Sequence, residues 1–123
     1  MQFTLEKTDH YAVIRLQEQK LNTLIAAALK SELLLLNTQG FNNIILDLSL
    51  SQYCDSSGLS AILVGNRLCR NAGGAFVICN LSEAVMKLVQ ISQLDQVLLI
   101  CKSFPEALEY VSSDKVEGNV GKD

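Results

Sequence analysis

The chain has 123 residues, a length that fits one domain with a hydrophobic core of its own. Apolar residues make up 49% of it and charged residues 19%, a balance typical of globular proteins and unlike that of disordered segments. Ten basic residues against thirteen acidic residues leave a formal net charge of −3. That charge excludes a broad basic surface for nucleic acid or for an anionic membrane.

No segment is apolar enough to predict a signal peptide or a membrane span. Residues 1–7 lack the apolar run of a secretory signal. The most apolar stretch, residues 24–36, is interrupted by Lys30, Ser31 and Glu32 and falls short of the roughly 20 residues that cross a bilayer. We therefore expect a cytoplasmic protein without membrane insertion.

The four cysteines do not follow the spacing of a metal site or of a disulfide framework. No two of them are spaced as C-x-x-C, and the single histidine, His10, is distant from all four in the sequence. A chain without an export signal is expected to keep its thiols reduced. We expect no metal or other cofactor and four reduced thiols, those of Cys54, Cys69, Cys79 and Cys101.

Two β-like segments come first, at residues 3–7 and 11–16. Alternation along the second segment places Ala12, Ile14 and Leu16 on one face and Tyr11, Val13 and Arg15 on the other, which favours a hairpin at the edge of a sheet. A polar connection at residues 17–20 follows. A helix is then expected at residues 23–37, because this stretch is rich in Ala and Leu and Gly40 follows it as a stop signal.

Strands and helices alternate along the rest of the chain. Residues 44–48 form a nearly continuous apolar run, typical of a strand that is covered on both faces of a parallel sheet. The expected elements after it are a helix at 57–72, a strand at 75–79, a helix at 83–91, a strand at 97–100 and a helix at 104–111. The order β-β-α-β-α-β-α-β-α predicts an α/β fold with a mixed, mostly parallel sheet and helices packed on it.

A polar tetrapeptide, Asp55-Ser56-Ser57-Gly58, stands at the start of the second predicted helix. Asp55, Ser56 and Ser57 are all good N-cap residues. The first turn of a helix has unpaired N–H groups and a partial positive charge, so a phosphate on Ser56 would be stabilised there. Gly58 has no side chain and would let the backbone of another protein approach. These residues either cap the helix alone or also form a modification and binding site.

Residues 43–70 resemble the central strand, loop and helix of STAS domains, the family of sulfate transporters and anti-sigma-factor antagonists. The family hallmark is a strand ending in Asp-Leu, followed by Asp-Ser-Ser/Thr-Gly-Leu at the start of a helix. Here it reads Asp47-Leu48 and Asp55-Ser56-Ser57-Gly58-Leu59. The resemblance implies one STAS-like domain over residues 1–111, and we expect residues 112–123 to form a flexible tail because they lack apolar periodicity.

The resemblance also implies a function. In antagonist members of the family, a partner anti-sigma kinase phosphorylates the serine that follows the aspartate, which is Ser56 here. The unphosphorylated protein binds the kinase and frees a sigma factor, and the phosphorylated protein is released. The expected partner is thus an anti-sigma factor with serine kinase activity, and a PP2C-type phosphatase is a further candidate.

No catalytic residues are expected in the chain itself. It contains neither a G-x-S-x-G elbow nor a phosphate-cradling P-loop, and His10 is the only imidazole that could act as a base. We therefore expect a regulatory protein and not an enzyme.

Helical periodicity places Leu59 and Leu63 on the polar side of the second helix, close to Ser56. The polar residues on that side are Ser60, Asn66, Arg67, Arg70 and Asn71. One interpretation is a partner-binding patch to which the loop also contributes Asp55, Ser57 and Gly58. The other is local packing beneath the loop at residues 49–54. The sequence leaves both open.

One position departs from the family pattern. Antagonists usually carry an acidic residue in a Gly-Glu-Leu-Asp-like turn before the first helix, near the phosphorylation site. Here the turn reads Gln19-Lys20-Leu21-Asn22, with Asn22 where the aspartate would fall. The resemblance also implies an alternative function, because STAS-like domains serve as constitutive scaffold subunits, for example of a lipid-transport ABC complex, without a phosphoswitch. The missing carboxylate at Asn22 slightly favours this alternative.

Overall fold

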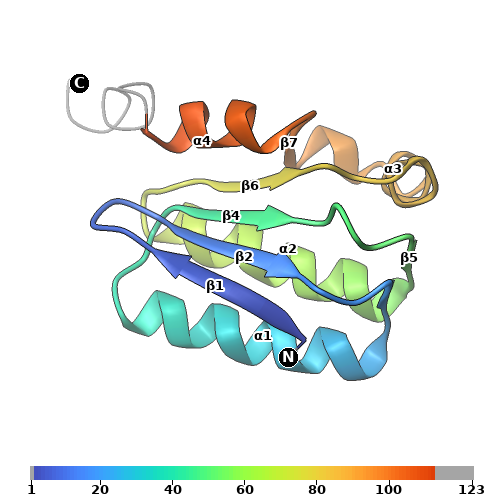
Figure 1. Ribbon diagram of the computed structural model, residues 1–123, viewed down its shortest axis with the longest axis horizontal. Coiled ribbons are helices and arrows are strands. Elements are labelled where there is room, and N and C mark those ends of the chain that lie inside the picture. Colours follow the sequence, from blue (N-terminus) through green and yellow to red (C-terminus); the bar gives the residue numbers. More distant parts are fainter. Residues whose placement is uncertain (1, 113–123) are drawn as a thin grey trace.

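A five-stranded sheet forms the centre of the computed structural model, which describes residues 2–112 (Figure 1). The strand order is β1-β2-β4-β6-β7; β1 is antiparallel to β2, and every other neighbouring pair is parallel. This mixed, mostly parallel sheet confirms the predicted fold class. The strands are β1 (Phe3–Lys7), β2 (Ala12–Leu16), β4 (Ile44–Asp47), β6 (Phe76–Cys79) and β7 (Leu99–Cys101).

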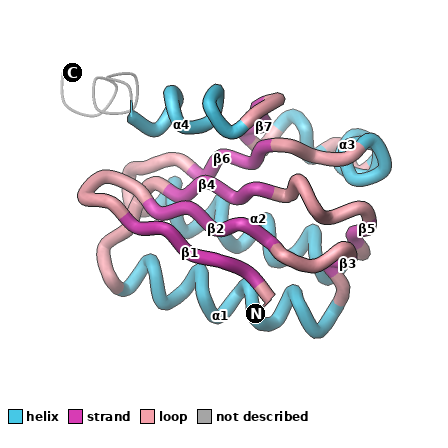
Figure 2. The backbone as a smooth tube through the Cα atoms, in the orientation of Figure 1, coloured by secondary structure: helices cyan, strands magenta, loops and turns pink. Residues whose placement is uncertain are grey.

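Helices cover both faces of the sheet (Figures 1 and 2). The long helices α1 (Thr23–Thr38) and α2 (Ser56–Asn71) pack on one face, and α4 (Phe104–Ser112) packs on the other. Between β6 and β7 the chain forms α3 (Glu83–Ile91) and a short 3₁₀ helix, η1 (Leu94–Gln96). No helix in the described region is both long enough and apolar enough to cross a bilayer.

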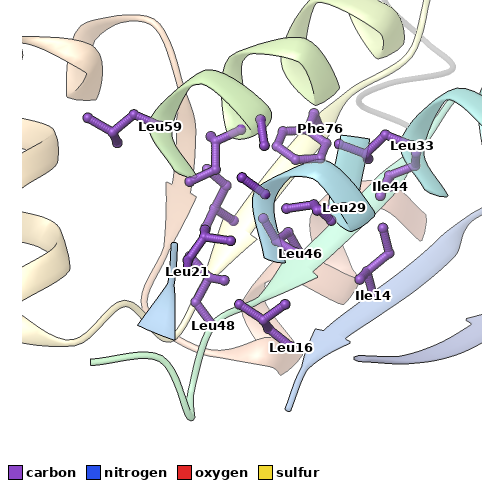
Figure 3. Packing of buried hydrophobic residues seen from close by; sticks show 14 of the residues in the cluster. Ile14, Leu16, Leu21, Leu29, Leu33, Ile44, Leu46, Leu48, Leu59 and Phe76 are labelled. Carbon is purple, nitrogen blue, oxygen red and sulfur yellow. The ribbon is translucent and has the colours of Figure 1, made fainter. Parts of the chain in front are cut away.

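The alternation of β2 sorts its side chains between two hydrophobic clusters. Ala12, Ile14 and Leu16 point into the larger cluster, between the sheet and the helices α1 and α2 (Figure 3). Val13 points into the smaller cluster beneath α4. The predicted alternation is therefore confirmed, and each face of the sheet is buried by its own helices.

A second, two-stranded sheet was not predicted. β3 (Lys20–Leu21) pairs in parallel with β5 (Tyr53–Cys54). The carbonyl of Gln19 extends the pairing, because it accepts hydrogen bonds from the backbone N–H groups of Gln52 (2.8 Å) and Tyr53 (3.1 Å). Strands of two residues are too short to show alternation, so this segment resembled a polar connection.

Several element boundaries differ from the sequence prediction by one or two residues. α2 starts at Ser56, one residue earlier than expected, because Asp55 serves as its N-cap. Val97 was expected in a strand, but it caps η1, and β7 begins only at Leu99. Of the predicted tail, Ser112 is the last residue of α4, and residues 113–123 lie outside the described part of the chain.

Helix α2 lies close to β6 at Gly65. A Cβ atom placed on Gly65 would lie 2.5 Å from the ring of Phe76, which is fully buried. Because the surrounding core holds this ring in place, the helix can pack here only through a residue without a side chain.

We therefore expect Gly65→Ala to destabilise the protein, although this exchange stabilises an ordinary helix interior by about 1 kcal/mol. Forcing a methyl group against a packed ring typically costs about 1–3 kcal/mol, so the free energy of unfolding in urea should fall. Ser60→Ala, on the exposed side of the same helix, is the control and should stay within about 0.5 kcal/mol of the parent. A Gly65→Ala protein more stable than the parent would show that this contact is absent.

Candidate functional site

The helices α1 and α2 begin side by side. The β3–β5 pairing sets Leu21 opposite Cys54, so that the next residues, Asn22 and Asp55, start the two helices together. Each of these residues is an N-cap: the Asn22 side chain accepts a hydrogen bond from the N–H of Ile25 (3.2 Å), and Asp55 from that of Gly58 (3.0 Å). The predicted motif therefore lies at a helix start, as expected, with a second helix start beside it.

The two serines of the motif have different surroundings. Ser56 is exposed and is the first residue of α2, and its hydroxyl makes no hydrogen bond to any residue that the structure describes. Ser57 is half-buried, and its Oγ lies 3.2 Å from Oγ1 of Thr23, which links the first turns of the two helices. A group from outside can thus reach the Ser56 hydroxyl without breaking an existing contact.

Leu59 does not lie on an exposed face, which favours local packing over a partner-binding patch for this residue. Its side chain is 8% exposed and belongs to the larger core cluster, at whose margin Figure 3 shows it. Leu63 is half-buried and packs against the same cluster. Asn66, expected on the polar side, is also only 6% exposed. Helical periodicity failed because α2 packs against α1 as well as against the sheet, which widens its buried side.

Gly58 is buried between α2 and the β3–β5 pair. A Cβ atom on Gly58 would lie 2.6 Å from Sγ of Cys54 and 2.7 Å from the carbonyl oxygen of Leu21. The missing side chain therefore lets α2 pack onto the β3–β5 pair. Gly58 thus has a packing role inside the fold, and a close approach of another protein there stays a prediction.

Exposed apolar side chains lie instead on the segments that lead into the two helices. Leu24, on the first turn of α1, is 71% exposed, and Tyr53, on β5, is 51% exposed. Leu24 also lines a groove of about 440 Å³, together with residues 17–20, Asn22 and Ile25. Sequence reasoning missed these residues because the β3–β5 pairing that brings them together went unrecognised.

The electrostatics of the site favour an anion. Neither α1 nor α2 has an acidic residue in its first turn, so the unpaired N–H groups of both helices leave partial positive charge there. Lys20 is exposed and lies opposite Tyr53 in the β3–β5 pair. The Asp55 carboxylate is the negative charge next to Ser56, and it is already engaged as the cap of α2.

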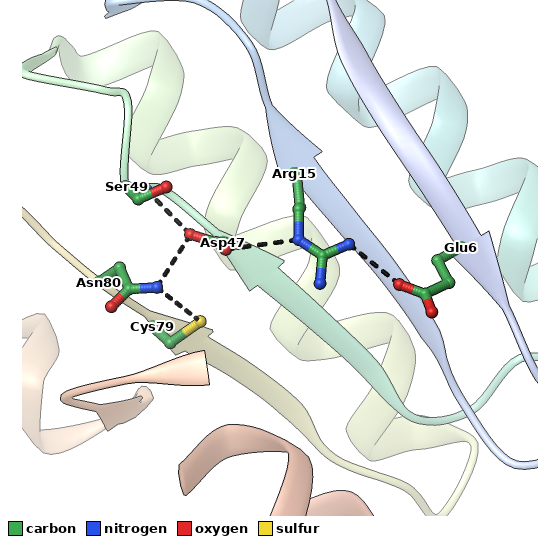
Figure 4. Close-up of polar contacts among 6 residues, drawn as sticks. All are labelled: Glu6, Arg15, Asp47, Ser49, Cys79 and Asn80. Carbon is green, nitrogen blue, oxygen red and sulfur yellow. Dashed lines mark hydrogen bonds and ion pairs between the residues drawn. The ribbon is translucent and has the colours of Figure 1, made fainter. Parts of the chain in front are cut away.

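The other aspartate of the family hallmark, Asp47, lies at the end of β4 and holds neighbouring elements together through its carboxylate. Its carboxylate is largely buried and accepts hydrogen bonds from the Ser49 N–H (3.0 Å) and the Asn80 side chain (3.2 Å), and it lies 3.6 Å from Nε of Arg15 (Figure 4). The Arg15 guanidinium stacks on the ring of Phe104 at 4.5 Å. Asp47 thereby connects β2, β4, the end of β6 and α4.

All four cysteines are free. Burial raises the pKa of the Cys54, Cys69 and Cys79 thiols to about 12 and also raises the pKa of Cys101, which is only half-buried. Within the described residues, no cluster of His, Cys, Asp or Glu side chains could hold a metal ion. The thiols thus behave as small apolar side chains.

Known proteins share both the sequence and the fold. Residues 2–107 match the STAS domain family, and the chain therefore belongs to that family. BtrV of Bordetella bronchiseptica, provisionally named an anti-sigma factor antagonist, is 30% identical over 92 residues, which are 75% of this chain and 78% of BtrV.

Solved structures give the same result. A Thermotoga maritima protein, also provisionally named an anti-sigma factor antagonist, is 27% identical with a TM-score of 0.80, covering 90% of this chain and 95% of that one. The anti-sigma factor antagonist SpoIIAA of Bacillus, in its unphosphorylated form, is 25% identical with a TM-score of 0.77 and coverages of 89% and 96%. A structure of SpoIIAA in its phosphorylated form is also similar, with a TM-score of 0.70.

The thiol environments predict an order of chemical reactivity. Only the thiolate reacts quickly with iodoacetamide, so at pH 8 the native protein should be alkylated first at Cys101. Cys54, Cys69 and Cys79 should react only after urea unfolds the chain, as peptide mass mapping of timed samples would show. Early alkylation of Cys54 would contradict this and would mean that the contact beneath Gly58 opens in the native state.

The cap of α2 is open to a direct test. Asp55→Ala removes the acceptor of the Gly58 N–H, and the loss of such a cap lowers the free energy of unfolding by about 0.5–2 kcal/mol. Asp55→Asn keeps an acceptor oxygen at the same place and should retain most of the stability. Urea titrations of the two variants measure the difference, and equal stability of Asp55→Ala and the parent would refute the capping role.

Proposed function

We propose that this protein is an anti-sigma-factor antagonist that binds an anti-sigma kinase and is released when Ser56 is phosphorylated. It acts by binding rather than by catalysis. Its family and the names of its relatives support this general role. The observation that carries the proposal is the exposed, uncommitted hydroxyl of Ser56 at the first position of α2, beside the start of α1.

The same geometry favours Ser56 over Ser57 as the acceptor. A kinase that modified Ser57 would have to separate its hydroxyl from that of Thr23, 3.2 Å away, and reach a half-buried side chain. At Ser56 the incoming phosphoryl group meets solvent. Accessibility therefore supports Ser56 as the acceptor, in agreement with the family pattern.

A phosphate on Ser56 should disturb the free protein little. It adds about 1.5 to 2 negative charges at neutral pH, which the open N–H groups at the start of α2 stabilise. The neighbouring Asp55 carboxylate opposes this gain in part. The effect of the phosphate then falls mainly on the complex, where it would be desolvated against the partner surface.

The partner surface that we propose differs from the one expected from sequence. Leu24 and Tyr53 supply exposed apolar area around Ser56, whereas Leu59 and Gly58 are buried. Asn22 keeps the cap of α1 while removing the carboxylate that the family pattern would place there. The kinase would then have to hold its metal nucleotide without help from a carboxylate at position 22.

We expect Ser56→Asp to weaken binding of a GHKL-type anti-sigma kinase from the same genome by tens-fold or more. A charge desolvated in an interface typically costs about 2–5 kcal/mol, whereas the melting temperature should hardly change because the helix start tolerates an anion. Calorimetric titration of the kinase measures the affinity. Ser56→Ala is expected to bind well and to resist phosphorylation, and its matched control, Ser57→Ala, should still accept phosphate.

Two results would defeat the proposal. One is Ser56→Asp binding the kinase as tightly as the parent, which would favour a constitutive scaffold. The other is mass-spectrometric mapping of the phosphate to Ser57 with Ser56 unmodified.

A further inference from the structure

The outer side of α2 carries a stripe of side chains that starts at Ser56. Ser60, Leu63, Arg67 and Arg70 follow it at spacings of three and four residues, which places them along one side of the helix. Ser60 and the two arginines are exposed, and Leu63 is half-buried. From Ser56 to Arg70 the helix rises about 21 Å, enough to extend the site well beyond the helix start.

The two arginines are uncompensated charges on an acidic protein. Among the described residues only Arg15 forms ion pairs, so neither Arg67 nor Arg70 is paired there with a carboxylate. Helix α2 contains no Asp or Glu at all, in a chain of net charge −3. Arg70 lies in the last turn, where it complements the helix dipole, but Arg67 lies about one turn earlier and gains less from that effect.

We propose that the side of α2 formed by Ser60, Leu63, Arg67 and Arg70 is a docking surface for an acidic segment of a partner protein. The proposal rests on the proposed function, because it names the chemistry of the partner that also covers Ser56. Charge complementarity selects this occupant: a guanidinium binds a carboxylate through two parallel hydrogen bonds, and two guanidinium groups one turn apart suit a run of Asp or Glu. Leu63 adds apolar contact between the charged end and the serine end.

With this surface, association of the partner and its release depend on different residues. Ser56 and Arg67 are about 16 Å apart along the helix, twice the screening length of about 8 Å at physiological salt. A phosphate on Ser56 therefore leaves the arginine charges in place. The arginines should govern how fast the partner arrives, in the phosphorylated and the unphosphorylated form alike, while the phosphate governs whether the complex persists.

The first test uses octaglutamate as the probe and needs no natural partner. Titrated into the isotopically labelled full chain at low salt, it should shift backbone amide resonances of residues 63–71 more than any others. The double variant Arg67→Gln/Arg70→Gln should lower its affinity at least fivefold. Lys87→Gln/Lys102→Gln, which removes two exposed charges from elsewhere on the protein, is the matched control and should bind like the parent.

Three outcomes of this titration would overturn the proposal. They are shifts centred away from α2, equal losses of affinity in the two double variants, and tighter binding of a duplex oligonucleotide than of octaglutamate to the same residues. The last result would assign the arginines to nucleic acid in place of a protein carboxylate.

The second test uses the anti-sigma kinase of the proposed function in stopped-flow mixing. Arg67→Gln/Arg70→Gln should slow association about tenfold at low salt and flatten its dependence on ionic strength, both with Ser56 and with Ser56→Asp. An unchanged association rate would contradict the docking surface even if Ser56→Asp weakens the complex. If the kinase does not bind the parent chain, the proposed function fails, and the octaglutamate titration still decides the docking surface.

Discussion

The pairing of Lys20–Leu21 with Tyr53–Cys54 is the constraint on which the arrangement of the site depends. It joins the segments before α1 and α2, and the Ser51 side chain adds a hydrogen bond of 3.0 Å to the carbonyl of Glu18 in the same region. Because the two strands are parallel and in register, both helices start at the same level and their N–H groups open on the same side. A shift of one residue in this register would move Asp55 away from Asn22 and separate the Thr23–Ser57 hydroxyl contact.

As a consequence of this arrangement, each of the neighbouring residues 55–58 has a different role. Asp55 is committed to capping, Ser57 to the contact with the other helix, and Gly58 to packing over Cys54. Ser56 alone in the tetrapeptide has an exposed side chain without such a task among the described contacts. A rigid helix start thus presents one free hydroxyl, which is the arrangement expected of a modification site on a stable scaffold.

The five-stranded sheet, the four helices and the position of the motif could be predicted from the sequence, because long apolar runs and caps such as Asp55 are local signals. The burial of a side chain could not be predicted where it depended on contacts between elements distant in the sequence. Leu59 and Asn66 were placed on the exposed side of α2 because one helix considered alone shows only one buried stripe, whereas this one is covered from two directions. The β3–β5 pair, with the exposed Tyr53, had no local signal either, since hydrogen bonding between two-residue strands leaves no periodic trace.

The packing at Gly58 also bears on how such proteins would change over time. A side chain there would collide with Cys54 and Leu21, so the glycine is needed for folding whether or not a kinase ever binds. Asp55 and Ser57 likewise have contacts to keep inside the protein. If the proposed function holds, a descendant that lost its kinase would therefore retain most of the tetrapeptide. Ser56 would be the first of the four residues free to drift, and its side chain, more than the presence of the motif, would distinguish a working switch from an inherited scaffold.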